Sequence, residues 1–174
     1  MKGFTLVEIL ISIFIFSLVF MAMFMLLSGG QASFYTGDAQ VELNQGLRNA
    51  LITMNRELRQ TRSTEINGVP ADDNFYTSVT FRVPEDVDGD GDVIDASGSM
   101  EWSGNINYAL NADNQIIRLV QADQSILANN ISSLRFRRFA GNLDVIQIHI
   151  TAQKATALGR SLESSIMSSI KMRN

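Results

Sequence analysis

The chain has 174 residues, 14 lysines and arginines against 18 aspartates and glutamates, and no cysteine. Its net charge of -4 argues against a protein that binds the phosphate backbone of nucleic acids, because such proteins carry a basic surface. Without cysteine the chain has no disulfide, so a secreted domain must be stabilised by its apolar core, by a metal ion or by packing against a helix.

The first predicted element is an apolar segment near the N-terminus. Residues 4–27 contain no proline, no glycine and one ionisable side chain, Glu8. About 20 apolar residues cross the hydrocarbon core of a bilayer, so the segment predicts a transmembrane helix. A cleaved secretory signal would have a shorter apolar region, of about 7–15 residues. A plain anchor fits the length but leaves Glu8 unexplained, because a carboxylate near the bilayer centre costs about 2.5–3.5 kcal/mol.

The residues around this carboxylate supply an explanation. Gly3-Phe4-Thr5-Leu6-Val7-Glu8 resembles the processing site of type IV prepilins and of type II secretion pseudopilins. The resemblance implies that residues 1–3 are a leader and that prepilin peptidase cuts between Gly3 and Phe4. It also implies that the new N-terminus of Phe4 is methylated and that Glu8 becomes the fifth mature residue.

Cleavage would leave a positively charged amine on Phe4 at the edge of the membrane. The Glu8 carboxylate of a neighbouring subunit would neutralise that amine, because two buried charges are tolerated only as a pair. Glu8 is therefore predicted to act in assembly and not in catalysis. Lys2 favours a cytoplasmic N-terminus by the positive-inside tendency, which places the head in the periplasm of a two-membrane bacterium.

The helix is predicted to continue beyond the span to about Arg62, as an amphipathic segment over residues 28–64. Apolar residues recur there at spacings of three and four, which places them on one helix face: Leu43, Leu47, Leu51, Met54 and Leu58. Gly29-Gly30 is a local weak point, because each glycine costs about 1 kcal/mol in a helix interior. The turn cluster Asn67-Gly68-Val69-Pro70 marks the end of the helical pattern.

Residues 65–174 are predicted to form a globular β-sheet head. Polar and apolar side chains alternate in several short segments, and turn residues pair four of these segments into two hairpins. A long helix with its apolar face on an antiparallel sheet gives an α+β fold. The strand segments are 78–83, 106–110, 116–120, 134–139, 143–151 and 165–172.

The similarity extends beyond the N-terminus. The long helix, the Asn-Ile-Ser-Ser-Leu-Arg-Phe strand at 130–136 and the final Ser-Ile-Lys-Met-Arg-Asn are similar to PilW-type minor pilins and to J-type pseudopilins. The resemblance implies a low-abundance subunit that joins other pilins or pseudopilins at a filament tip and primes assembly. It would start in the inner membrane and move into the filament. A major pilin is an alternative, and the choice between a pilus and a secretion system stays open.

A second chemical signal is an aspartate-rich loop at residues 86–95. Three aspartates and Gly91 match loop positions 1, 3, 5 and 6 of an EF-hand-like calcium site. The glutamate expected at position 12 is replaced by Ser97, so Asp95 or Glu101 is expected to complete the shell. A solvated acidic loop without a metal is the alternative. The predicted calcium ligands are Asp86, Asp88, Asp90, Asp92 and Asp95.

No enzyme is expected, although a membrane-tethered periplasmic enzyme or binding module is the alternative from another class. The chain has no glycine-rich phosphate loop, no Cys/His cluster and no paired acid–base residues. His149 and the serines at 161–169 are interpreted as strand surface. The arginines Arg135, Arg137 and Arg138 alternate with aromatic residues as on a half-buried strand, so no nucleic acid partner is expected.

Overall fold

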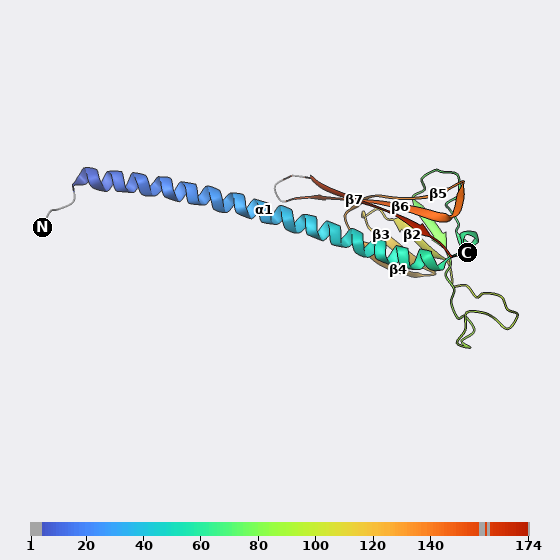
Figure 1. The fold of residues 1–174 in the computed structure, drawn as a ribbon. Coiled ribbons are helices and arrows are strands. Elements are labelled where there is room, and N and C mark those ends of the chain that lie inside the picture. The colour runs from blue at the N-terminus through green and yellow to red at the C-terminus, as the bar shows by residue number, and fades with distance from the viewer. Residues whose placement is uncertain (1–4, 157–158, 160, 174) are drawn as a thin grey trace.

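The computed structural model describes residues 5–156, 159 and 161–173. One long helix projects from a β-sheet head, and its N-terminal half extends well beyond that head (Figure 1). Helix α1 runs from Leu6 to Gln60, a length on the order of 80 Å. The helix passes through Gly29-Gly30 without interruption, so the expected weak point does not break it.

The helix ends slightly earlier than expected, at Gln60 instead of about Arg62. Thr61 is fully buried, has an extended backbone, and accepts a hydrogen bond from the backbone nitrogen of Arg173 at 3.1 Å. Arg62 and Arg173 form a parallel bridge. The helix therefore ends where the backbone begins to pair with the C-terminal residues, and the 3-10 turn Ser63–Glu65 follows.

The α+β class is confirmed, but the strands of the described residues form two antiparallel sheets instead of one. The first sheet has the order β1-β2-β3-β4 and the second β5-β6-β7. The segment before β1 joins the second sheet, because Tyr76 and Phe136 exchange backbone hydrogen bonds of 2.8 and 2.7 Å. The strands are β1 (Ser78–Phe81), β2 (Ile106–Leu110), β3 (Ile116–Val120), β4 (Asp123–Ala128), β5 (Ile131–Phe139), β6 (Asn142–Ala155) and β7 (Ser161–Lys171).

The two predicted hairpins are confirmed as β2–β3 and β5–β6. The last strand, β7, begins earlier than predicted and pairs along β6 up to Ala155. Strand β4 was not predicted, because its first four residues are all exposed and show no alternation of polar and apolar side chains.

The core lies where the second half of α1 packs on β4, β6 and β7. The helix residues predicted to share a face are buried, except that Leu51 lies half-buried at the edge. On the sheet side Phe81 and Tyr108 are fully buried, with ring centroids 5.4 Å apart. Burying one such side chain contributes about 1.5–3 kcal/mol, so these two rings stabilise the core of the head. The buried helix residues are Leu43, Leu47, Ala50, Met54 and Leu58.

Candidate assembly segment and candidate metal site

The first half of α1 makes no buried contact with the head. From Thr5 to Gln31 every described residue is exposed, including large side chains such as Phe14 at 64 % and Phe24 at 73 %. By length and composition this stretch is apolar enough to cross a membrane. The protein itself does not cover these side chains, and an exposed apolar surface of this size is typical of a membrane or protein contact.

The N-terminal end of α1 presents the one carboxylate of this stretch. Thr5 caps the helix, because its hydroxyl accepts a hydrogen bond from the backbone nitrogen of Glu8 at 3.3 Å. Glu8 lies in the first turn and is exposed, and none of the described residues forms an ion pair with it. Gly3 and Phe4, the predicted cleavage and methylation site, lie outside the described residues. The described residues therefore supply no counter-charge for Glu8.

The other polar groups of the apolar stretch are satisfied within the helix. The hydroxyl of Ser12 donates to the carbonyl of Glu8 at 2.8 Å, and that of Ser17 donates to the carbonyl of Phe14 at 2.7 Å. Serine hydroxyls bonded to their own helix in this way need no partner from lipid or water. Among the described polar side chains of the apolar stretch, Glu8 is thus the one that carries a charge, and that charge is costly in a bilayer.

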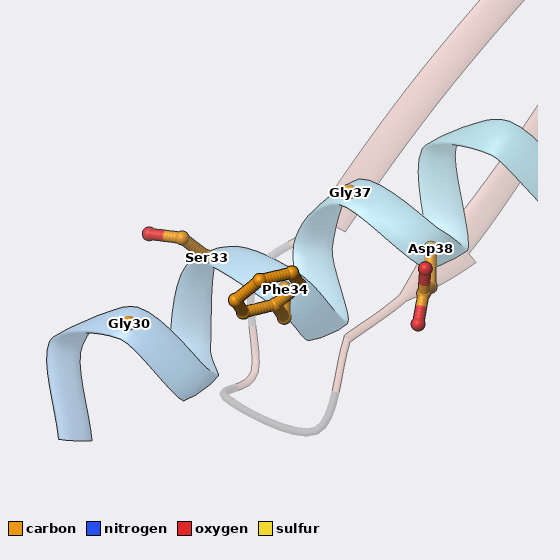
Figure 2. A pocket seen from close by; sticks show the side chains of 5 residues that line it. All are labelled: Gly30, Ser33, Phe34, Gly37 and Asp38. Carbon is orange, nitrogen blue, oxygen red and sulfur yellow. The ribbon is translucent and has the colours of Figure 1, made fainter. Parts of the chain in front are cut away.

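A shallow hollow of about 320 Å³ interrupts the surface of α1 between the apolar stretch and the head. Gly30 and Gly37 lie on either side of the Phe34 ring, and Asp38 follows one turn later (Figure 2). Phe34 is 77 % exposed, and nothing lies within 4 Å of a Cβ built on either glycine. Small residues of this kind let a second helix approach closely.

The aspartate-rich loop belongs to a longer excursion, residues 84–102, which we call the acidic arm. The arm begins and ends at a bridge between Pro84 and Trp102 and extends away from the rest of the head (Figure 1). Its aspartate-rich loop is held by side-chain caps: the two carboxylate oxygens of Asp86 accept hydrogen bonds from the backbone nitrogens of Gly89 and Gly91 at 2.7 and 2.9 Å. Both glycines have positive φ, at 80° and 94°, which side-chain-bearing residues rarely adopt.

Three carboxylates of the acidic arm converge. One oxygen each of Asp86, Asp88 and Glu101 lies within 4.8 Å of the other two. Two oxygens that each sit about 2.4 Å from one calcium ion are at most about 4.8 Å apart, so the spacing suits that ion. Glu101 also accepts a hydrogen bond from the backbone nitrogen of Val87 at 2.6 Å, which orients it toward the loop. Of the two residues expected to complete the shell, Asp95 or Glu101, it is Glu101 that lies in this cluster.

The other predicted ligands lie outside this cluster. Asp90 accepts a hydrogen bond from the backbone nitrogen of Asp92 at 2.8 Å. Asp95 is engaged with the next turn: its carboxylate accepts hydrogen bonds from the hydroxyl of Ser97 at 2.6 Å and from the backbone nitrogen of Ser99 at 2.9 Å. The bond from the Ser97 hydroxyl is the main reason that the pKa of Asp95 lies below its usual value. A calcium site over all five aspartates stays a prediction.

Residues 1–24 match the family model described as the prokaryotic N-terminal methylation motif. The chain therefore carries a type IV pilin-like prepilin signal. The motif covers the predicted leader, the predicted cut and Glu8, and it overlaps the apolar half of α1 that the head leaves exposed. No curated protein and no solved structure matches the chain.

The remaining sequence candidates lie on the second sheet. His149 is half-buried on β6 between Arg135 of β5 and Met167 of β7. Arg138 points inward and is only 7 % exposed, and its guanidinium donates to the carbonyls of Leu143 at 2.9 Å and Val69 at 3.4 Å. Burial lowers the pKa of Arg138 from its usual value. Arg138 therefore serves the packing of the head, on the strand face opposite Arg135 and Arg137, and its burial was not predicted.

The sequence did not indicate the polar contact between helix and first sheet. Glu57 of α1 accepts a hydrogen bond from the hydroxyl of Tyr108 at 2.6 Å and pairs with Arg118 at 3.0 Å. These residues are 51 and 61 positions apart from Glu57 in the chain, so no local pattern joins them. The only hint in the sequence was that the charged residue Glu57 directly precedes Leu58, which lies on the apolar face of the helix.

Proposed function

We propose that this chain is a minor pilin of the PilW type, a structural subunit that primes or caps assembly of a type IV pilus. The match of residues 1–24 to the methylation motif carries the proposal. The bare apolar half of α1 supports it, because a filament gives such a helix neighbouring helices to pack against. The glycine-flanked hollow at Phe34 offers a place for close helix–helix approach.

In this proposal prepilin peptidase cuts between Gly3 and Phe4, and Phe4 becomes the N-methylated end of the mature chain. The chain starts in the bacterial inner membrane with its N-terminus in the cytoplasm and its head in the periplasm. Glu8 then neutralises the amine of Phe4 on a neighbouring pilin, which removes two unpaired charges from an apolar environment.

A pseudopilin of the J type in a type II secretion system is the alternative within the same class. A membrane-anchored periplasmic enzyme or binding module is the alternative from another class. The motif and the fold favour a structural subunit over an enzyme.

Mass spectrometry of the native protein tests the processing step. In cells with active prepilin peptidase, we expect a mature chain that begins with N-methylated Phe4. Cells lacking the peptidase should retain Met1-Lys2-Gly3 and serve as the control. An intact leader in the peptidase-positive cells would refute the proposal. Purifying sheared pili and, separately, secretion complexes then shows which of the two contains the chain, and so distinguishes a pilus subunit from a secretion-system subunit.

We also propose that the acidic arm binds calcium through Asp86, Asp88 and Glu101. Carboxylate oxygens are the ligands that calcium prefers, and the three side chains already converge within the spacing that one ion needs. Asp90 and Asp92 lie close by in sequence and would supply further oxygens only if the loop tightened around the ion. In the periplasm, bound calcium would offset the repulsion among these carboxylates.

A further inference from the structure

The negative charge of the chain is concentrated in the acidic arm. The acidic arm has no lysine or arginine and seven carboxylates, so it carries -7. The whole chain carries -4, and the residues outside the arm therefore carry +3, the difference between these two values. Charges segregated in this way attract the opposite surface of another copy. The carboxylates of the arm are Glu85, Asp86, Asp88, Asp90, Asp92, Asp95 and Glu101.

The outer face of the second sheet carries the opposite charge. We call Arg135, Arg137 and Lys171, with the side chains between them on that face, the basic face. Strand register places Arg135 next to His149 and Met167, and Arg137 next to Gln147 and Ser169. Within the described part of the chain, none of the three cations forms an ion pair. Glu163 is the acidic residue of the same strand face and lies toward the other end of β7.

The central cation of this face is held in a fixed orientation. The guanidinium of Arg137 lies 4.7 Å from the ring centroids of both Phe75 and Phe139. It also donates to the side-chain oxygen of Gln147 at 2.6 Å. An arginine ordered in this way before binding loses less conformational entropy when a carboxylate meets it.

Exposed apolar side chains accompany the charges on both surfaces. On the basic face Met167 is 63 % exposed and Phe75 46 %. On the acidic arm Val87 is 67 % exposed and Ile94 45 %. Protein interfaces combine apolar contact with complementary charge, and each of these two surfaces offers both.

We propose that the acidic arm of one copy docks on the basic face of a second copy of this chain. Asp90 and Asp92 pair with the cations of that face, and Val87 and Ile94 cover its exposed apolar groups. Both halves of the contact are present on this chain, whereas a polyanion such as nucleic acid would be repelled by the arm. Because the two surfaces differ, the contact is heterologous: one copy contributes its arm and the other its sheet face.

Site-specific cross-linking of the full chain in detergent micelles tests the contact. The chain has no cysteine, so each introduced thiol is unique. One preparation carries Met167→Cys on the basic face and the other Ala96→Cys on the acidic arm, both at exposed positions. After mixing and mild oxidation we expect several-fold more disulfide-linked heterodimer than with Ala112→Cys, an exposed alanine in the turn between β2 and β3. Equal yields from the two alanine positions would overturn the proposal.

Charge reversal provides the second arm of the experiment. Arg135→Glu with Lys171→Glu in the Met167→Cys chain should lower the yield several-fold, and so should Asp90→Lys with Asp92→Lys in the Ala96→Cys chain. Mixing the two reversed chains should restore it, because opposite charges face each other again. Failure to restore the yield, with both chains folded by circular dichroism, would also overturn the proposal.

This measurement uses purified chains and does not depend on cleavage after Gly3. A missing cross-link therefore leaves the proposed pilin role in place. Conversely, an uncleaved leader in cells refutes the proposed role and leaves the contact between heads unaffected.

Discussion

Arg118 on β3 and Glu57 on α1 form an ion pair that fastens the helix to the first sheet. The Nε of Arg118 lies 3.0 and 3.1 Å from the two carboxylate oxygens of Glu57. The hydroxyl of Tyr108 donates to one of the same oxygens at 2.6 Å. The Glu57 side chain is only 12 % exposed, so its charge depends on these two partners for compensation.

Replacing Glu57 with alanine should destabilise the head. The substitution leaves Arg118 and Tyr108 without their partner in a largely buried site, and breaking a pair of this kind costs about 2–4 kcal/mol. Glu42→Ala is the matched control, because Glu42 pairs with Lys154 at the surface and its side chain is 62 % exposed. That control should lower the free energy of unfolding by about 0–1 kcal/mol. Thermal unfolding of the full chain in detergent measures both, and equal losses would contradict the prediction.

The same contact predicts a loss of stability in alkali. Burial, and then the hydrogen bond to Glu57, raise the pKa of Tyr108 above the usual value of 10.0. Below pH 10 the phenol is protonated in both the folded and the unfolded chain, so its contribution is fully present. Above pH 10 the unfolded chain loses this proton more readily, and the free energy of unfolding falls as the pH rises. Tyr108→Phe should flatten this fall, and an unchanged alkaline slope would contradict the assignment.

Glu8→Leu should separate membrane insertion from assembly. The leucine removes the costly charge, so the variant should still enter the membrane. It should not co-purify with filaments, because the amine of the neighbouring Phe4 would lack its counter-charge. Ser12→Leu, one turn further along the same helix, is the control and should assemble normally. Immunoblots of membranes and of sheared filaments give both readouts, and filament levels of Glu8→Leu equal to those of the control would refute the role.

Calcium binding should depend on the three converging carboxylates. Asp86→Asn with Asp88→Asn should weaken calcium binding at least about tenfold, since the ion would lose two charged ligands. Asp113→Asn, in the exposed turn between β2 and β3, should leave it unchanged. Calorimetric titration of the full chain in detergent compares them. No heat of binding at millimolar calcium in the unmodified protein would refute the site.

The helix and most strands were predictable because their signals are local. The apolar face of α1 follows a spacing of three and four residues, and β2 and β3 are flanked by turn residues, so both elements appear in a short window. Strand β4 gave no such signal, because Asp123, Gln124, Ser125 and Ile126 are all exposed and the strand forms by pairing along β3. Likewise the aspartate-rich loop was visible in the sequence, but only the fold brings Glu101 beside Asp86 and Asp88.

By itself the sequence determined the membrane-competent helix, the processing motif and the carboxylate at Glu8, because each depends on residues adjacent in the chain. The tertiary structure decided where α1 ends, how the strands divide into two sheets, and which partners Glu57 and Glu101 find. These depend on contacts between residues far apart in the chain, such as Thr61 with Arg173, and such contacts form only when the whole head packs.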